Sequence, residues 1–229
     1  MKRGIGLFGA AWTLGAGMLV LAGISTGGVG DRSPIWLDVV GKSLSITATE
    51  VTAAQFQSCV DVGSCEATHF DNCNLGDASR SDHPMNCVDY YGAEQYCAFA
   101  GGRICSESEW LAACAGAEGR AYPYGDTYEI DTCNMQSLDN PVAGRGKATA
   151  AVGSNTTCVG GVAGLYDMAG NVSEWVDKCT GDYCKFRGGA YLTNDPMDQY
   201  AACGSVCAGN DKSFKNATVG IRCCRDDAP

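Results

Sequence analysis

Residues 164–176 read GLYDMAGNVSEWV, and this stretch places two acids, Asp167 and Glu174, seven positions apart around a turn of small residues. If the chain reverses at Gly170, the two carboxylates can converge, and backbone carbonyls freed by the turn add further oxygen ligands. Hard oxygen ligands of this kind suit Ca²⁺. The segment therefore predicts either a calcium site or a buried turn in which Asp167 accepts hydrogen bonds from backbone amides and Glu174 pairs with an arginine.

The composition is that of a globular domain of ordinary size, with 229 residues, of which 45% are hydrophobic and 18% charged. Glycine is abundant at 31 residues and proline is scarce at 6, which favours a loop-rich fold over a helical bundle. The net charge is −10 and no run of lysine and arginine occurs, so nucleic acid is not an expected partner.

The first residues carry the pattern of an export signal. Lys2 and Arg3 precede an uncharged and mostly apolar segment over residues 4–24. We therefore expect residues 1–27 to be a signal peptide, followed by one domain over residues 35–229. The apolar segment also has about the 20 residues that span a bilayer. An uncleaved N-terminal anchor is thus the alternative, and it is the one membrane contact that we expect.

The cysteine content indicates disulfides rather than a metal site. The chain has 15 cysteines but only two histidines, His69 and His83, and no C-x-x-C spacing occurs. Zinc and iron–sulfur sites need such spacings or further ligands, whereas export supplies an oxidising compartment in which disulfides persist. We therefore expect an exported protein, secreted, periplasmic or at the cell surface, that is stapled by disulfides. At least one thiol is left over, because 15 is odd.

Local patterns predict three short helices in the first half of the chain. Thr52 and Gln55 form a capping box, in which a side-chain acceptor starts the helix and a glutamine follows three residues later. Ser106 and Glu109 form a second capping box, and Asp89 caps a helix that ends at a Gly-Gly pair. The second half of the chain reads as loops and short strands. Helices early and strands late predict an α+β fold rather than alternating βαβ units.

Six sequence blocks carry a resemblance to a known family. They are EVTAAQF, HPMNCVDYYGAEQYCAFAGGRICSESEW, YPYGD, GLYDMAGNVSEW, RGGAY and VGIRC. In this order, the chain resembles formylglycine-generating enzymes, the sulfatase-modifying-factor family, over nearly all of the predicted domain. The resemblance implies a C-type-lectin-like α+β fold with short strands, few helices and many loops. For active members of the family, it also implies that copper and oxygen oxidise a substrate cysteine to formylglycine.

The resemblance assigns ligands to the predicted calcium site. In the family, the block GLYDMAGNVSEW is a calcium site. Matching the positions one by one implies four ligands in this chain, Asp167, Gly170, Val172 and Glu174, the middle two through their backbone carbonyls.

The copper-binding thiols of the family are missing. Active members carry a C-x-x-x-x-C pair shortly after an RGGS block, and counting without a gap places that pair at Thr193 and Asp198, with Ala190 in place of the serine. The register holds because Cys203, five positions later, matches a structural cysteine of eukaryotic members. Cuprous copper needs soft thiolates, which neither threonine nor aspartate supplies. Copper and the family's oxidase chemistry are therefore not expected here.

Two other cysteine pairs are candidates for relocated thiols. Cys203 and Cys207 lie close together in the sequence, and Cys179 and Cys184 have the C-x-x-x-x-C spacing but precede the RGGAY block. A disulfide is the simpler explanation of each pair.

The resemblance also implies two specific disulfides. Eukaryotic relatives have bridged cysteines at matching places, which predicts the pairs Cys97–Cys223 and Cys114–Cys203. Cys224 needs a different partner, because adjacent residues of a strand point in opposite directions. The C-x-x-x-x-C pair described above supplies its nearest candidates.

These expectations favour an exported domain of the sulfatase-modifying-factor family with a degenerate copper site. Its predicted role is binding of a peptide, a glycan or a protein partner on a calcium-supported scaffold. One alternative is an active oxidase of the formylglycine-generating type that uses the relocated thiols. A second alternative is a structural component of a cell surface.

Overall fold

The computed structural model describes Met1 and residues 32–67, 72–137, 148–193, 197–205 and 208–227. The predicted signal or anchor thus lies, apart from Met1, outside the described residues. The helices are α1 (Ala53–Asp61), the 3₁₀ helix η1 (Ala78–Arg80), α2 (Tyr90–Phe99), α3 (Glu107–Ala115) and α4 (Met197–Ala201). The strands are β1 (Trp36–Asp38), β2 (Leu44–Thr47), β3 (Arg103–Ile104), β4 (Gln136–Ser137), β5 (Ser173–Thr180), β6 (Tyr183–Arg187), β7 (Leu192–Thr193), β8 (Gly209–Asp211), β9 (Val219–Gly220) and β10 (Cys223–Asp226).

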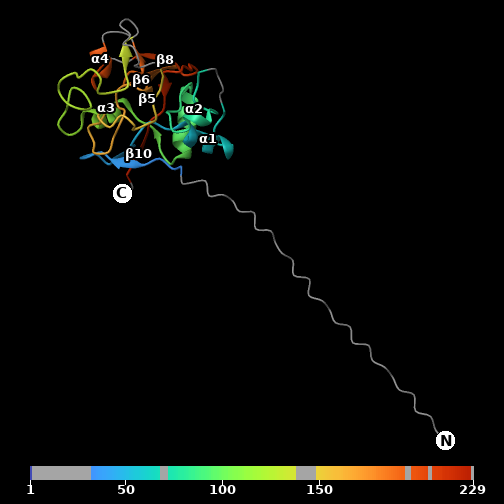
Figure 1. Cartoon of the computed structure of the whole chain (residues 1–229). Coiled ribbons are helices and arrows are strands. Elements are labelled where there is room, and N and C mark those ends of the chain that lie inside the picture. The colour runs from blue at the N-terminus through green and yellow to red at the C-terminus, as the bar shows by residue number, and fades with distance from the viewer. Residues whose placement is uncertain (2–31, 68–71, 138–147, 194–196, 206–207, 228–229) are drawn as a thin grey trace. The chain divides into compact units, whose positions relative to one another are not determined.

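An antiparallel sheet joins the two ends of the domain. Its strand order is β1-β2-β10-β3, so the last strand lies between two early ones. Strand β10 pairs with β2 through Cys224 and Ile46, and with β3 through Cys223 and Ile104. Figure 1 shows this sheet at the base of the domain, with the C-terminus beside it.

A second sheet, with strand order β8-β6-β5-β9, forms the centre of the domain. Its longest element is the antiparallel hairpin of β5 and β6, and β9 pairs parallel to β5. Strands β4 and β7 form a separate parallel pair. Short strands, few helices and long loops make this the α+β fold that the sequence predicts.

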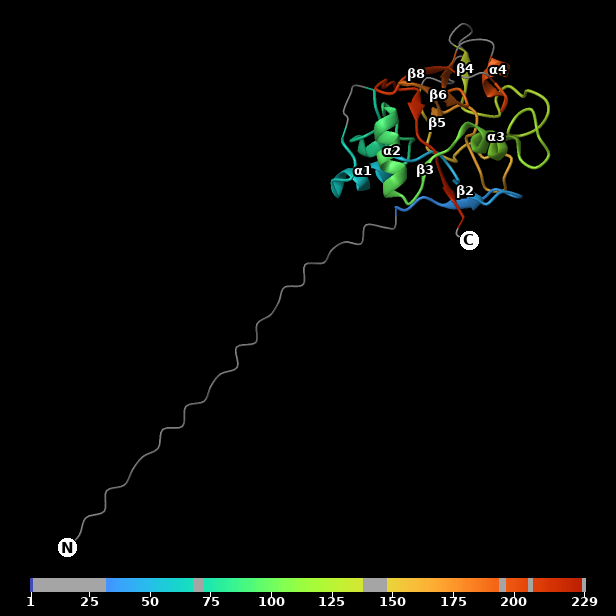
Figure 2. The same ribbon diagram turned by 180° about the vertical axis from the view of Figure 1, so that it is seen from behind.

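Strand β5 separates two hydrophobic clusters because its successive side chains point to opposite faces. Trp175 packs with the cluster that contains Phe56 of α1 and Tyr96 of α2. Val176 packs with the cluster that contains Trp110 of α3. Figures 1 and 2 show α1 and α2 on one side of the central strands and α3 on the other.

The predicted helix starts are confirmed. In α1, the Thr52 side chain accepts a hydrogen bond from the Gln55 amide while the Gln55 side chain accepts one from the Thr52 amide. Ser106 and Glu109 make the same reciprocal pair at α3. Asp89 caps α2 by accepting a hydrogen bond from Gly92. Each capping residue satisfies a backbone donor that the first helical turn leaves free.

Seven disulfides staple the domain. They are Cys59–Cys65, Cys73–Cys87, Cys97–Cys223, Cys105–Cys224, Cys114–Cys203, Cys133–Cys158 and Cys179–Cys184. They use 14 of the 15 cysteines. The remaining one, Cys207, lies outside the described residues.

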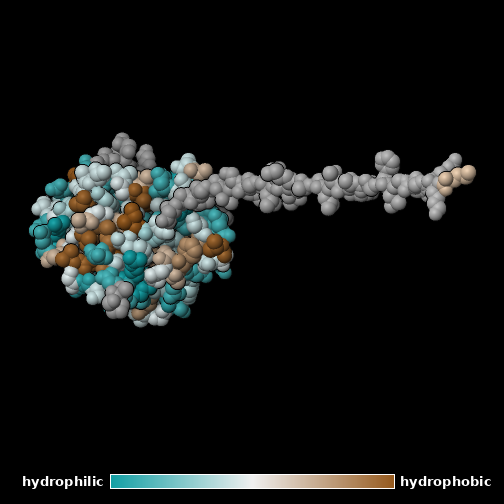
Figure 3. Space-filling model, turned by 90° about the horizontal axis from the view of Figure 1, so that it is seen from below, coloured by the Kyte–Doolittle hydropathy of each residue, from teal (hydrophilic) through white to brown (hydrophobic). Residues whose placement is uncertain are grey.

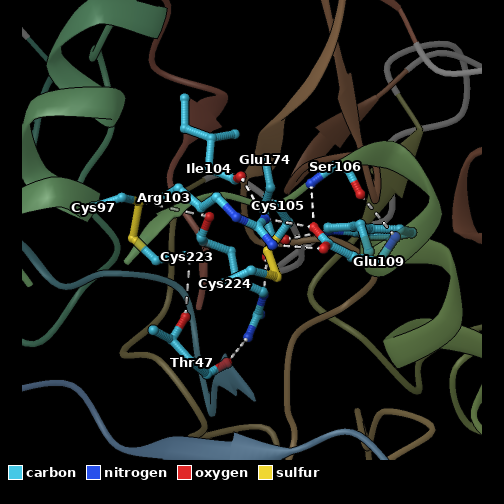
Figure 4. Close-up of a disulfide and its surroundings, with 12 residues drawn as sticks. Thr47, Cys97, Arg103, Ile104, Cys105, Ser106, Glu109, Glu174, Cys223 and Cys224 are labelled. Atoms are coloured by element: carbon cyan, nitrogen blue, oxygen red, sulfur yellow. Dashed lines mark hydrogen bonds and ion pairs between the residues drawn. A yellow bond between two sulfur atoms is a disulfide. The ribbon is translucent and has the colours of Figure 1, made fainter. Parts of the chain in front are cut away.

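The two pairs that the resemblance implies are present, with Cα atoms 5.5 Å apart in Cys97–Cys223 and 5.6 Å apart in Cys114–Cys203. The partner expected for Cys224 is wrong. Cys224 bonds to Cys105, while the two candidate cysteines at the end of the β5–β6 hairpin bond to each other. Figure 4 shows how the two adjacent cysteines of β10 diverge: the Cys223 sulfur points toward α2, and the Cys224 sulfur points toward the start of α3.

On the face that Figure 3 displays, hydrophobic residues lie in separate patches between hydrophilic ones. Among the described residues, no helix has both the length and the apolar character needed to cross a membrane.

Candidate functional site

The stretch GLYDMAGNVSEWV forms a tight buried turn. Asp167, Gly170 and Asn171 all have positive φ angles, of 58°, 77° and 57°. Left-handed backbone is unfavourable for most side chains, whereas glycine adopts it freely. At Gly170 glycine is also required by space, because a Cβ atom there would lie 2.5 Å from the carbonyl oxygen of Asn134. The small residues of the stretch therefore let two segments of backbone approach closely.

The two acids of this turn have separate partners. Asp167 is buried, and its Oδ2 accepts a hydrogen bond from the Gly153 amide at 2.6 Å. Glu174 accepts from Arg222 Nε at 2.8 Å through one oxygen and from Trp110 Nε1 through the other. Figure 4 shows Glu174 among the residues that surround the disulfides of β10. The contacts match the second interpretation of the sequence, a buried turn in which one acid caps an amide and the other meets an arginine.

Arg222 links this turn to strand β2 of the first sheet. Besides Glu174, its guanidinium donates to the carbonyl oxygens of Thr47 and Tyr166, each at 2.7 Å. The side chain has no solvent exposure. A buried guanidinium is stable only when its donors are satisfied, so the arginine of the VGIRC block has a structural explanation.

Glu50 is a third buried acid at this turn, which sequence reasoning missed. One of its oxygens accepts from the Val172 amide at 3.0 Å, and the other accepts from Asn171 Nδ2 at 2.8 Å. Its position at the start of the EVTAAQF block was the available signal, but its partners lie more than 100 residues away in the sequence.

Glu50, Asp167 and Glu174 are three buried carboxylates; Arg222 contacts Glu174, and its charge acts on all three. Burial raises the pKa of Glu50 well above its ordinary value, and the charges of Asp167 and Glu174 raise it further. Burial also raises the pKa of Asp167 and that of Glu174, against the lowering effect of Arg222. The turn thus holds more negative charge than Arg222 neutralises, and either protons or a bound cation would relieve the excess.

The residues at the turn fit Ca²⁺ in part. Asp167 has a second carboxylate oxygen besides the one that accepts from an amide, and the excess negative charge favours a cation. Both oxygens of Glu174 already accept one hydrogen bond each, which leaves this carboxylate fewer lone pairs for a cation. Across the described part of the chain, no three His, Cys, Asp or Glu side chains are grouped to hold a metal ion. Calcium binding stays a prediction, with the side chains of Asp167 and Glu174 and the backbone carbonyls of Gly170 and Val172 as the expected ligands.

The positions of the family's copper thiols do not fit Cu(I). Thr193 lies on β7, half-buried and paired with Ser137 of β4. Asp198 lies on α4, and its side chain is outside the described residues. Ala190 is buried next to them in sequence. Hydroxyl and carboxylate oxygens are hard ligands, whereas Cu(I) prefers soft sulfur.

The proposed replacement thiols are not available as a pair. Cys203 is buried and bonded to Cys114, so its sulfur is not a thiolate in this structure. Cys207 lies outside the described residues. Cys179 and Cys184 are bonded to each other across the hairpin. A copper site made of relocated thiols therefore has no support among the described cysteines.

Trp175, His83 and Arg187 have structural partners. Trp175 is buried, and its Nε1 donates to the Val88 carbonyl. His83 Nδ1 lies 2.9 Å from the Thr149 hydroxyl, and His69 lies outside the described residues. Arg187 of the RGGAY block donates from Nη2 to Glu107 Oε1 of α3 at 2.6 Å.

Comparison with known proteins places these features in a family. The sequence profile described as "Sulfatase-modifying factor enzyme 1-like domain" matches residues 13–227. Serine/threonine-protein kinase Pkn1 of Chlamydia trachomatis serovar L2 is 30% identical over 63% of this chain and 24% of its own length. Formylglycine-generating enzyme of Thermomonospora curvata is 29% identical over 64% of this chain and 57% of its own length.

A relative named as inactive matches this chain at an identity similar to that of the Thermomonospora curvata enzyme. Inactive C-alpha-formylglycine-generating enzyme 2 of Bos taurus is 28% identical over 65% of this chain and 52% of its own length. The chain thus spans about half or less of the length of most of these relatives. Among solved structures, CarF has a TM-score of 0.60 at 22% identity, covering 81% of this chain and 87% of CarF. PvdO from Pseudomonas aeruginosa has a TM-score of 0.59 at 21% identity, covering 80% of each chain. These two structures support the fold alone.

Proposed function

This chain belongs to the sulfatase-modifying-factor family, and on that premise we propose that it is an exported binding module rather than a formylglycine-generating oxidase. The observation that carries the proposal is the pair Thr193 and Asp198, which stand where active members have their copper-binding cysteines. Without two thiolates at these positions, Cu(I) has no soft ligands with which to activate oxygen. A relative named as inactive and one named as a formylglycine-generating enzyme match the chain at similar identity, so the two cysteine positions carry the distinction.

The disulfides support the exported part of the proposal. Seven disulfides fit an extracellular or lumenal protein, because reducing compartments keep most cysteines as thiols. They also fit a rigid scaffold, which a binding module needs in order to present a fixed surface. The ligand class is a peptide, a glycan or a protein, and calcium bound at Asp167 is a proposed support of the scaffold.

The deciding experiment is an oxidation assay on a sulfatase-type cysteine peptide. The protein is incubated with the peptide, Cu(I), ascorbate and oxygen, and mass spectrometry follows conversion of the peptide thiol to the aldehyde. We expect no aldehyde above the level without protein, because no thiolate pair binds the copper. The Thermomonospora curvata enzyme in the same buffer provides the positive control. Aldehyde formation by this chain would refute the proposal.

A double variant tests whether the absent cysteines explain the expected lack of oxidase activity. The double substitution Thr193→Cys with Asp198→Cys restores the spacing of the family thiols. We expect this variant to bind Cu(I) against a competing chelator, whereas the wild-type protein does not. Equal Cu(I) binding by both proteins would mean that thiols elsewhere in the chain bind the metal.

A further inference from the structure

Three asparagines of the chain begin an Asn-x-Thr or Asn-x-Ser triplet, which is the acceptor pattern for asparagine-linked glycans. They are Asn155 in NTT, Asn171 in NVS and Asn216 in NAT. A glycan is bulky and strongly hydrated, so a folded domain accommodates one only where the asparagine side chain reaches solvent. The structure therefore separates three triplets that the sequence presents as equivalent.

Asn171 does not meet this condition. Its side chain is 1% exposed, and Ser173, the third residue of its triplet, is also buried. The Asn171 Nδ2 atom donates to Glu50 Oε2 at 2.8 Å and to the Ala150 carbonyl oxygen at 3.3 Å. A sugar on this nitrogen would displace these contacts and would need space inside a packed turn. A glycan at Asn171 is thus incompatible with the fold.

Asn216 is exposed and lies in the loop between β8 and β9. Its carboxamide oxygen accepts a hydrogen bond from the Thr218 amide at 2.9 Å and another from the Thr218 hydroxyl at 2.8 Å. The two side chains that define the triplet therefore lie together at the surface. Within the described part of the chain, the Asn216 Nδ2 atom donates no hydrogen bond, so a sugar attached there replaces no contact.

The backbone of this loop is held in place by other groups. The Asn216 carbonyl accepts from the Cys87 amide at 3.0 Å and from the Val219 amide at 3.1 Å. The Ala217 carbonyl accepts from Asn86 Nδ2 at 2.9 Å. These bonds use the main chain of the triplet and leave the Asn216 side chain to solvent. Modification of Nδ2 therefore leaves the attachment of the loop intact.

Asn155 is the less accessible of the two surface triplets. Asn155 is half-buried, whereas Thr157 is exposed. The Thr157 hydroxyl lies 2.7 Å from Asn155 Oδ1 and 2.8 Å from the Thr132 carbonyl oxygen, so its one proton serves two acceptors. Among the residues that the structure describes, none accepts a hydrogen bond from Asn155 Nδ2. We therefore expect modification here at a lower occupancy than at Asn216.

We propose that Asn216 and, at lower occupancy, Asn155 accept an asparagine-linked glycan, and that Asn171 does not. This inference rests on the export in the proposed function, because these glycans are attached to chains that have left the cytosol. The donor is a lipid-linked oligosaccharide pyrophosphate. A bond forms between Nδ2 and the anomeric carbon of the sugar, and the bond from that carbon to the pyrophosphate breaks. The pyrophosphate keeps the electron pair of the broken bond, one proton leaves Nδ2, and nothing is oxidised or reduced.

The test places the full chain behind a host secretory signal in a eukaryotic cell line. Folded, oxidised protein is recovered from the secretory compartments or the medium by size-exclusion chromatography. Peptide N-glycosidase then converts each glycosylated asparagine to aspartate, and mass spectrometry of the peptides gives the occupancy at each site. We expect aspartate at position 216, a smaller fraction at position 155, and unchanged asparagine at position 171.

Two variants with a matched control test the role of the triplet hydroxyl. Thr218→Ala should abolish the modification of Asn216 and leave that of Asn155 unchanged, whereas Thr218→Ser keeps the hydroxyl and should keep the modification. Ser213→Ala removes an exposed hydroxyl from the same loop but lies outside the triplets, so it should leave both sites occupied. Thermal melts before and after removal of the glycans should give a folded protein in both cases, because neither surface site lies in the core.

The proposal is overturned if Asn216 is unmodified in the recovered protein, if Asn171 is modified in it, or if Ser213→Ala removes the glycan as Thr218→Ala does. A higher occupancy at Asn155 than at Asn216 would overturn the argument from exposure. These outcomes are separable from the proposed function, because the host signal supplies export and the variants leave Thr193, Asp198 and all cysteines unchanged. Aldehyde formation in the oxidation assay refutes the binding-module function whatever the occupancy, and an unmodified Asn216 without aldehyde refutes only the glycan sites.

Discussion

Glu174 and Arg222 form an ion pair with almost no solvent contact: the carboxylate oxygen lies 2.8 Å from Arg222 Nε, and the two side chains are 1% and 0% exposed. Such a pair contributes little net stability relative to an apolar replacement, because both charges lose their hydration. Removing one partner is different, since the other charge is then buried without compensation. This pair also connects the candidate site to β2 and β10, because Arg222 precedes Cys223 and donates to the Thr47 carbonyl.

The first prediction concerns this pair. The substitution Arg222→Met should lower the free energy of unfolding by about 3–5 kcal/mol, because Glu174 is then buried without a cation and must either stay charged or take up a proton. Urea unfolding of the oxidised protein measures the change. The double variant Arg222→Met with Glu174→Gln should recover part of the loss, because the glutamine still accepts from Trp110 but carries no charge. If the double variant is as unstable as the single one, the uncompensated charge is not the cause.

The second prediction concerns calcium. If Asp167 and the turn carbonyls bind Ca²⁺ in the folded chain only, calcium stabilises the protein by mass action, by about 2.7 kcal/mol at 100 times the dissociation constant. Thermal melts in calcium and in chelator should therefore differ, and Asp167→Ala should abolish the difference. Asp182→Ala, at the turn of the β5–β6 hairpin, is the control and should keep it. Identical wild-type melts in calcium and in chelator would rule out the site.

The third prediction concerns acid stability. Two hydrogen bonds of 2.7 Å from the Arg103 guanidinium hold the pKa of Glu109 at about 2, below its ordinary value of 4.5. Figure 4 shows Arg103 reaching Glu109 at the start of α3. A depressed acid pKa contributes stability that is present above pH 4.5 and is lost as the pH falls toward 2.

The test is the variant Glu109→Gln, whose free energy of unfolding should fall less steeply than that of the wild-type protein between these pH values. Glutamine at this position keeps the capping box, as Gln55 does in α1. Glu118→Gln removes an exposed carboxylate and is the control for a general effect of charge. A wild-type slope in Glu109→Gln would contradict the assignment.

The sequence predicted the features that depend on near neighbours. The capping box of Thr52 and Gln55 spans four residues, so the pattern of residue types determines it. The partner of Cys224 depends instead on the sheet. Strand β10 lies beside β3, which brings Cys224 to Cys105 across 119 residues. Cys179 and Cys184, which are nearer to Cys224 in the sequence, were therefore the wrong candidates for its partner.

The candidate site shows the same division. The turn at Gly170 and the two acids around it could be read from one short stretch. Glu50 could not, because only folding brings it to the Val172 amide. The stretch predicts an arginine beside Glu174 as one of two alternatives, but no pattern within it identifies Arg222 as that arginine or shows how deeply the acids are buried.

The last prediction concerns the two disulfides of β10. Cys97–Cys223 and Cys105–Cys224 close loops with sequence separations of 126 and 119 residues, and these loops are almost the same. Each alone would stabilise the fold by about 4–5 kcal/mol in the chain-entropy model. When one bridge is intact, however, the other closes only a remaining ring of about nine residues, which contributes about 2–3 kcal/mol.

Removing Cys97–Cys223 alone, by alanine at both positions, should therefore lower the free energy of unfolding by about 2–3 kcal/mol, and removing both bridges should lower it by about 7 kcal/mol. The comparison is Cys114–Cys203, with a sequence separation of 89 residues. With Cys105–Cys224 intact it closes a ring of about 30 residues, so its removal should cost about 3.5–4 kcal/mol. Urea unfolding of the three variants gives the order directly, because all six cysteines are buried to a similar degree and leave similar cavities. If removing Cys97–Cys223 alone destabilises the protein as much as removing Cys114–Cys203, the overlap of the two loops does not govern the stability.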